Sequence, residues 1–219
     1  MSLPSLVPPA QAHSLPWVVV VPVKPFARAK SRLGPDIDSR RAALARAFAA
    51  DTVAAVRAVQ AVRLVVVVTG DRAAREALRG PGIHLLGEPT PAGLNAAAST
   101  GIAWVRRHHP DAAVAVVTAD LPALRAEDAA TVLRLATAHP RAVVADREGT
   151  GSTVITAWPG EPLQPLFGPD SMQRHRRDGA VRLHESELVR AARDVDTATQ
   201  LAEAVRLGVG QATARVLAD

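Results

Sequence analysis

The chain has 219 residues, 48% of them hydrophobic, which is long enough for one domain with a sizeable core. It contains no cysteine, so disulfides, thiolate metal sites and a cysteine nucleophile are excluded, and a reducing cytoplasm fits. The net charge is +5, but only 3% of the residues are aromatic and none is tyrosine. Because single strands stack on aromatic rings, we expect no nucleic-acid partner and favour a small anionic substrate.

Residues 1–16 carry no charged leader region and are interrupted by prolines. No apolar run approaches the ~18 residues that span a bilayer. We therefore expect no signal peptide and no membrane partner, with residues 1–16 as a flexible tail and residues 17–219 as one folded domain. The sequence leaves the oligomeric state open, a homodimer included.

Apolar runs alternate with helical patterns from Trp17 onward, which predicts an α/β fold with a mostly parallel central sheet. Strands are predicted over residues 17–23, 63–71, 82–88, 112–120, 141–146, 152–158 and 188–196. Helices are predicted over residues 39–59, 73–79, 93–109, 125–139, 169–177 and 197–207. Ligands of such sheets bind at the carboxyl ends of the strands, so the loops after these strands are the places to look for chemistry.

The loop after the first strand, "KPFARAKSRL", holds four cations: Lys24, Arg28, Lys30 and Arg32. Lys24 and Lys30 are the only lysines among the 26 basic residues. A lysine ammonium is a compact point charge that suits phosphate, and a triphosphate would neutralise the repulsion within this cluster. The alternative is a solvated basic loop, and neither a P-loop nor a dinucleotide-binding glycine pattern is present.

Carboxylates follow two of the predicted strands. Asp120 ends the fourth strand in "VVTADLPAL", and Asp194 and Asp196 end the last one in "DVDT". If these strand ends lie close together, Asp120 with Asp194 or Asp196 forms an oxygen site suited to Mg²⁺. The alternative is that Asp196 caps the helix that follows it.

Hydroxyls and glycines mark a third region, in "GTGSTVITA" and "FGPDSMQRHRRDGA". Thr153, Gly168 and Ser171 offer hydroxyls and backbone amides, and Ser171 stands near a predicted helix N-terminus, where anions bind. The alternative is an arginine-rich surface turn. No Ser-His-Asp order, HExxH pattern or glutamate pair emerges. A phosphate monoester that attacks a nucleotide needs none of these, because it is already an anion and needs positioning and charge neutralisation.

With these residues in view, the chain resembles the guanylyltransferases that activate phosphoenolpyruvate or 2-phospho-L-lactate in the biosynthesis of the deazaflavin coenzyme F-420. These are relatives of the molybdenum-cofactor nucleotidyltransferases. Six stretches carry the likeness, in this order: "VPVKPFARAKSRL", "GLNAAASTGIAW", "TADLPAL", "GTGSTV", "FGPDSMQRH" and "DVDT". The resemblance implies a single Rossmann-like, GT-A-like nucleotidyltransferase domain, a three-layer sandwich that uses GTP and Mg²⁺ and releases pyrophosphate.

The resemblance also implies roles for single residues. Thr153, Gly168 and Ser171 are expected to bind the phospho-acid, and Asp120 with Asp194 or Asp196 to bind the metal. Lys24 and Lys30, with Arg32 beside them, are expected to contact the triphosphate, and Lys24, Lys30 and Asp120 to be catalytic. Gly93 and Asn95 of "GLN" are expected to face the base or ribose.

Two features depart from the wider nucleotidyltransferase group. Pro22 and Pro25 stand in a first loop that is glycine-rich elsewhere, which shifts phosphate binding from backbone amides to the lysines, and Glu88 stands where an aspartate is expected. The abundance of alanine and arginine suggests a high-GC bacterium, and in that setting the resemblance favours phosphoenolpyruvate over 2-phospho-L-lactate. The remaining alternatives are a sugar-phosphate or molybdopterin nucleotidyltransferase of the same fold and a non-catalytic GTP-binding regulator.

Overall fold

The structure is a computed structural model that describes residues 15–26, 40–87, 93–184 and 186–218. Most of the expected N-terminal tail lies outside the described residues, as do Arg28, Lys30, Arg32 and Glu88. The expected triphosphate contacts of Lys30 and Arg32 therefore stay predictions.

In the part of the chain that the structure describes, seven strands form one sheet in the order β3-β2-β1-β4-β6-β5-β7. β6 runs antiparallel to its neighbours β4 and β5, and every other pairing is parallel. The strands are β1 (Trp17–Pro22), β2 (Val62–Val68), β3 (Ile83–Leu86), β4 (Ala113–Val117), β5 (Arg141–Ala145), β6 (Ser152–Ala157) and β7 (Val181–Arg182). The prediction of a mostly parallel sheet is confirmed.

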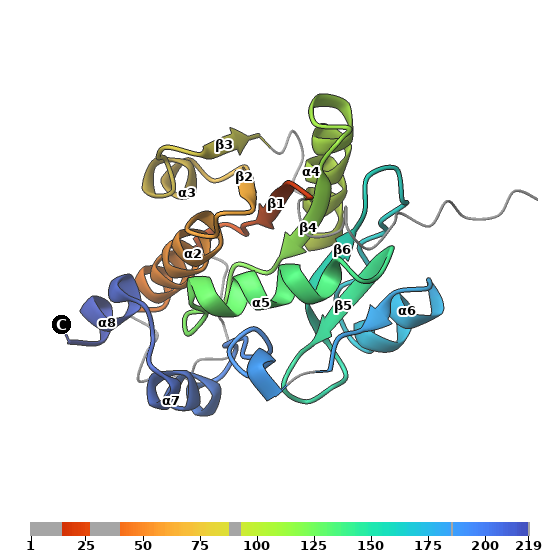
Figure 1. Cartoon of the computed structure of the whole chain (residues 1–219). Helices are drawn as coiled ribbons and strands as arrows, with labels where there is room; N and C mark the ends of the chain where they lie inside the picture. Colours follow the sequence, from red (N-terminus) through yellow and green to blue (C-terminus); the bar gives the residue numbers. More distant parts are fainter. Residues whose placement is uncertain (1–14, 27–39, 88–92, 185, 219) are drawn as a thin grey trace, which may run out of the picture.

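Helices cover both faces of this sheet (Figure 1). They are α2 (Arg41–Arg57), α3 (Arg72–Ala77), α4 (Leu94–His108), α5 (Ala126–Ala136), α6 (Ser171–Arg177), α7 (Ala198–Leu207) and α8 (Gln211–Ala218), with a short 3-10 helix, η3 (Ser186–Leu188). α2, α3 and α5 pack on one face, α4 and α6 on the other, and α7 packs on α2. In the described ranges, no helix is long and apolar enough to cross a bilayer.

β1 lies inside the sheet, and all six of its residues are buried. Successive side chains of a strand point to opposite faces, so a strand buried on both faces is apolar throughout. Val19 and Val21 accordingly pack against α2 and α5, while Val18 and Val20 pack against α4. This is why the run "WVVVV" reads as a central strand and places the loop after it at the carboxyl edge of the sheet.

A glycine allows α4 to approach β1 closely. A Cβ at Gly101 would overlap Cγ1 of Val20 and lie 3.0 Å from Cγ2 of Val68. Real Cβ atoms do not approach this closely, so only glycine fits between the helix and the two strands.

The prediction of a last strand over residues 188–196 is wrong. The segment makes a local bond instead of a ladder bond, from Ala192 N–H to Leu188 O (2.9 Å). Its buried side chains are Leu188, Ala191 and Val195, a spacing of three and four that suits turns and not a strand. The segment is partly buried, as its apolar residues indicate, but its buried positions do not alternate.

β7 and α8, near the C-terminus, were not predicted. β7 has only two residues, too few for a period. α8 is capped from a distance, because Oδ1 and Oδ2 of Asp51 in α2 accept hydrogen bonds from Ala212 N–H (2.9 Å) and Thr213 N–H (2.8 Å). The cap lies 161 residues away, so the sequence around α8 carries no helix-start signal.

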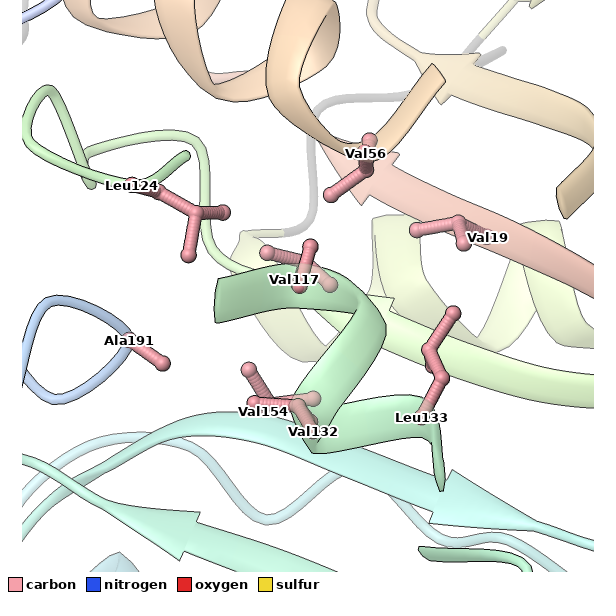
Figure 2. Close-up of a pocket in the computed structure, with 9 residues that line it drawn as sticks. Val19, Val56, Val117, Leu124, Val132, Leu133, Val154 and Ala191 are labelled. Atoms are coloured by element: carbon pink, nitrogen blue, oxygen red, sulfur yellow. The ribbon is translucent and has the colours of Figure 1, made fainter. Parts of the chain in front are cut away.

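A small gap remains between α2, α5 and the sheet (Figure 2). Its volume is about 10 Å³ and no polar surface lines it; the lining side chains are Val19, Val56, Val117, Leu124, Ala129, Val132, Leu133, Val154 and Ala191. An apolar gap of this size stays dry and holds no ligand. Ala191 closes one side of it, which shows how the segment before Asp194 is packed into the core (Figure 2).

Candidate active site

The carboxyl ends of β1, β2 and β4 meet at one edge of the sheet because these strands are neighbours and parallel. Lys24 stands two residues after β1 and is exposed. Asp120 stands three residues after β4 and is half-buried. The structure therefore brings a cation and a carboxylate, both predicted as site residues, to the same edge.

Asp71 ties the loop after β1 to the loop after β2. Its Oδ2 accepts a hydrogen bond from Phe26 N–H (2.9 Å), and its Oδ1 accepts one from Ala73 N–H (2.8 Å) at the start of α3. The same carboxylate thus caps α3 and fixes the chain two residues after Lys24. The sequence showed only a Gly-Asp turn here, although an aspartate directly before a helical pattern is itself a capping signal.

Asp120 and the "DVDT" segment lie side by side, although no strand carries that segment. Val195 N–H donates to the backbone oxygen of Asp120 (3.1 Å), so Asp194 and Asp196 flank a residue bonded to Asp120. Oδ1 of Asp120 and Oδ1 of Asp194 are both shielded from solvent. The two segments are therefore adjacent through their backbones, and a shared metal site of their carboxylates stays a prediction.

Two side chains hold the chain around this pair. Thr52 of α2, which is fully buried, accepts a hydrogen bond from Leu121 N–H (3.1 Å) and so anchors the loop after β4. Thr153 of β6 donates its hydroxyl proton to the backbone oxygen of Ala191 (2.6 Å) and so anchors the approach to Asp194. Both threonines act on the backbone beside a carboxylate.

Asp120 and its neighbours suit a hard divalent cation with few protein ligands. Within the described part of the chain, no three His, Cys, Asp or Glu side chains are grouped so as to hold one metal ion. Mg²⁺ is commonly held by one or two carboxylates, with waters and substrate phosphates as its other ligands. Asp120 with one of Asp194 and Asp196 fits that pattern.

Capping of α7 is done by Thr197 and not by the side chain of Asp196. Thr197 Oγ1 accepts from Gln200 N–H (3.2 Å), and Gln200 Oε1 accepts from Thr197 N–H (3.0 Å), which makes a capping box. The backbone N–H of Asp196 also donates to Gln200 Oε1 (2.8 Å). The N-cap of α7 is therefore Thr197, the residue after Asp196.

Thr153, Gly168 and Ser171 belong to adjoining parts of the fold. Thr153 lies in β6 next to Ser152, and Ser152 Oγ is 2.7 Å from Oγ of Ser171 at the start of α6. Gly168 lies three residues before α6, and its backbone oxygen accepts a hydrogen bond from Ser171 N–H (3.1 Å). Thr153 is 1% exposed and its proton is engaged by Ala191, so its binding of the phospho-acid stays a prediction.

Asn95 holds the chain that leads to Gly168. Its Nδ2 donates to Phe167 O (3.0 Å), and its Oδ1 accepts from Phe167 N–H (2.8 Å). Both ends of the amide are used on backbone, so the structure gives Asn95 a positioning function, and its contact with base or ribose stays a prediction. Gly93 precedes α4 with φ of +93°, a conformation that favours glycine, and a Cβ there would meet open space.

His175 of α6 lies at the centre of the same region. It is 2% exposed, its Nε2 accepts a hydrogen bond from Leu166 N–H (2.9 Å), and its Nδ1 lies 2.9 Å from Ser152 Oγ. Burial, reinforced by the positive charge of Arg174, lowers the pKa of His175 to about 4, so the ring is neutral near pH 7. Sequence reasoning named His175 only as part of a basic helix, although its position four residues after Ser171 places both on one helix face.

Arg174 lies over Gly168. Its Nη2 is 3.3 Å from where a Cβ of Gly168 would be, and Gly168 adopts φ of +119°. Nε and Nη2 of Arg174 are buried and have no hydrogen-bond partner among the described residues. Guanidinium donors in such a place suit a carboxylate or phosphate oxygen, which makes Arg174 a candidate site residue that sequence reasoning did not single out.

A groove of about 580 Å³ adjoins α6. It is lined by Gly149, Thr150, Asp170, Met172, Gln173, Arg176, Arg177 and Arg182. Three arginines against one aspartate make it electropositive, so an anion that approaches the Gly168–Ser171 region meets a favourable field.

The chain is similar in sequence to proteins of known families. Residues 45–198 match the MobA-like NTP transferase domain. The phosphoenolpyruvate guanylyltransferase of Streptomyces scabiei is 49% identical over 207 residues, which cover 92% of this chain and 96% of that protein. The enzyme of the same name from Streptomyces coelicolor is 48% identical, with the same coverage of both chains.

Solved structures share the fold at low identity. A 4-diphosphocytidyl-2C-methyl-D-erythritol synthase superposes with a TM-score of 0.56 at 12% identity, covering 88% of this chain and 99% of that one. Rv0371c of Mycobacterium tuberculosis in complex with manganese superposes with a TM-score of 0.51 at 18% identity, covering 88% and 99%. These structures support the nucleotidyltransferase-like α/β fold.

Proposed function

Because the chain belongs to the phosphoenolpyruvate guanylyltransferases of the MobA-like NTP transferase family, we propose that it transfers GMP from GTP to the phosphate of phosphoenolpyruvate. The products are enolpyruvyl-diphospho-guanosine and pyrophosphate, and the step belongs to coenzyme F-420 biosynthesis. The observation that carries the proposal is the identity of 49% over 92% of the chain.

The reaction replaces one phosphorus–oxygen bond by another. An oxygen of the phosphoenolpyruvate phosphate bonds to the α-phosphorus of GTP, and the bond from that phosphorus to the β-phosphate bridging oxygen breaks. The attacking oxygen is already anionic, so no general base is needed. What the protein must supply is alignment of two anions and neutralisation of the charge that passes to pyrophosphate.

The edge that carries Lys24 takes the nucleotide. Lys24, exposed beyond β1, provides a positive charge for the triphosphate, and the sequence adds the cations Lys30 and Arg32 shortly after it. Gly93 stands at the N-terminus of α4, where backbone N–H groups and the helix dipole favour an anion or a hydroxyl. Asp71 holds the loop that carries Lys24 by accepting the hydrogen bond from Phe26 N–H.

The region around α6 takes the phospho-acid. Ser171 offers a hydroxyl group. Gly168 has no side chain, so the ligand can approach its backbone, and Thr153 lies nearby in β6. Arg174 provides guanidinium donors for the carboxylate or phosphate of phosphoenolpyruvate.

Asp120, with Asp194 or Asp196, would hold Mg²⁺. When bound, Mg²⁺ supplies charge neutralisation at the phosphates and a template that orients them. Hydrogen bonds of Thr52, Thr153 and Val195 hold the backbone beside these carboxylates.

Phosphorus NMR of the product tests this function. Purified protein with GTP, Mg²⁺ and phosphoenolpyruvate is expected to convert the phosphomonoester signal into a coupled pair of diphosphate signals, with free pyrophosphate in equal amount. ATP, CTP and UTP in place of GTP test the nucleotide choice. A phosphomonoester signal that persists while GTP binds would instead support the non-catalytic regulator.

A further inference from the structure

The segment Leu166–Gly168 and the first turn of α6 are held by one imidazole ring. His175 is 2% exposed and packs edge-on against Phe167, with ring centroids 5.4 Å apart. Nε2 accepts the hydrogen bond from Leu166 N–H, and a backbone N–H can only donate. Nε2 therefore carries no proton, and in the neutral ring the proton lies on Nδ1.

The proton on Nδ1 fixes the direction of the next bond. Nδ1–H donates to Ser152 Oγ at 2.9 Å, and Ser152 Oγ lies 2.7 Å from Ser171 Oγ. Because Ser152 Oγ accepts from the ring, the Ser152 hydroxyl can donate its hydrogen bond to Ser171 Oγ. The Ser171 hydroxyl can then donate to an oxygen of a bound ligand. An anionic oxygen needs such a donor. Ser171 is 1% exposed, so neighbouring groups and not solvent set the direction of its hydroxyl.

We propose that His175 is the positioning residue of the phospho-acid site. Its Nε2 holds Leu166 and thereby places Gly168. Its Nδ1 holds Ser152, which orients the hydroxyl of Ser171. This inference rests on the proposed function, because it concerns how that function's acceptor is bound.

Substitutions can remove the two hydrogen bonds of the His175 ring one at a time. His175→Asn keeps an N–H donor near the position of Nδ1 and loses the bond to Leu166. His175→Gln keeps an acceptor near the position of Nε2 and loses the bond to Ser152. Ser152→Ala leaves the ring in place and removes the link to Ser171, and Ser99→Ala, on the exposed side of α4, is the matched control.

The experiment measures the KM for phosphoenolpyruvate at saturating GTP and the KM for GTP at saturating phosphoenolpyruvate. Each of His175→Asn, His175→Gln and Ser152→Ala is expected to raise the first about three- to tenfold, the loss of one hydrogen bond, and to leave the second unchanged. Thermal unfolding shows which variants are folded. A merely structural function would raise both constants together, and that result, or unchanged constants in all three folded variants, overturns the proposal.

Failure of the proposed function is distinguishable from failure of this inference. If the wild-type protein releases no pyrophosphate, the function falls, and titration calorimetry with phosphoenolpyruvate then makes the same comparison by affinity. Weaker binding by Ser152→Ala than by Ser99→Ala supports the positioning function of His175. Equal affinity of wild type and all three variants overturns it.

Discussion

Asp120 is the residue on which the metal assignment depends most. Asp120→Asn keeps the size of the side chain and removes its charge, so the site should lose its metal, whose contribution is several kcal/mol. Turnover is expected to fall about a hundredfold or more. Initial rates over a range of Mg²⁺ concentrations measure this. Asp111→Asn is the control, because Asp111 is an exposed aspartate that pairs with Arg63 near the other end of β4. A wild-type rate for Asp120→Asn at all Mg²⁺ concentrations would remove Asp120 from the metal site.

Lys24 tests the expectation that a compact ammonium binds the triphosphate. Lys24→Ala is expected to raise the KM for GTP about tenfold or more, the range of a charged hydrogen bond, and to leave the KM for phosphoenolpyruvate unchanged. Lys24→Arg should recover only part of the loss, because a planar guanidinium is not equivalent to an ammonium. Arg79→Ala, an exposed change before β3 at the opposite edge, is the control. Full activity of Lys24→Ala would contradict the assignment.

For single residues, the sequence predicts which of them lie near one another in the fold, but not what each side chain contacts. Asp120 and Asp194 were placed from their positions after apolar runs, and the structure brings them together. Asn95 and Thr153 were expected to contact ligands, yet their polar atoms bond to backbone. Whether a side chain faces a ligand or a neighbouring carbonyl depends on contacts between distant segments, and no local pattern encodes them.

The packing of α4 on β1 makes a prediction at the level of elements. Gly101→Ala favours the helix by intrinsic propensity but forces a Cβ onto Val20, so the free energy of unfolding should fall by about 1–3 kcal/mol, a typical cost of overpacking. Val20→Ala removes both Val20 methyl groups, the closer one included, and leaves only Cγ2 of Val68 near the new Cβ. In that background Gly101→Ala should cost much less. Urea unfolding of the two single variants and the double variant measures the coupling, and additive effects would contradict the close approach.

Elements with a clear apolar pattern of their own were predictable, and those defined by distant contacts were not. β1, α2 and α5 follow from apolar patterns within the elements themselves. Residues 188–196 looked like a strand because the stretch is rich in apolar residues, yet the bond from Thr153 to Ala191 and the packing of Val195 shape it as a turn. α8 depends on the carboxylate of Asp51, which only the folded chain brings near.

The pH dependence of stability is a property of the whole molecule. The folded-state pKa of His175 is about 4, below the ordinary 6.5, because burial and Arg174 disfavour the charged ring, while Asp178 opposes them. Between those two values the unfolded chain binds a proton that the folded chain does not, so the free energy of unfolding falls as the pH drops from about 6.5 towards 4. Above that window His175 contributes no pH dependence.

Urea unfolding at pH 7 and pH 5 checks this for the wild-type protein and His175→Gln. The other six histidines are present in both proteins, so the difference between them isolates His175. The wild-type protein should lose more stability between the two pH values than the variant. Equal losses would mean that His175 titrates normally in the folded state.

The central claim is that the chain transfers GMP to phosphoenolpyruvate, and pyrophosphate release tests it most directly. Initial rates are measured with GTP and Mg²⁺ alone, with phosphoenolpyruvate added, and with 2-phospho-L-lactate added. Release that depends on phosphoenolpyruvate and is slower or absent with 2-phospho-L-lactate is the predicted result. Release with 2-phospho-L-lactate alone, or none with either acid although GTP binds, would contradict it.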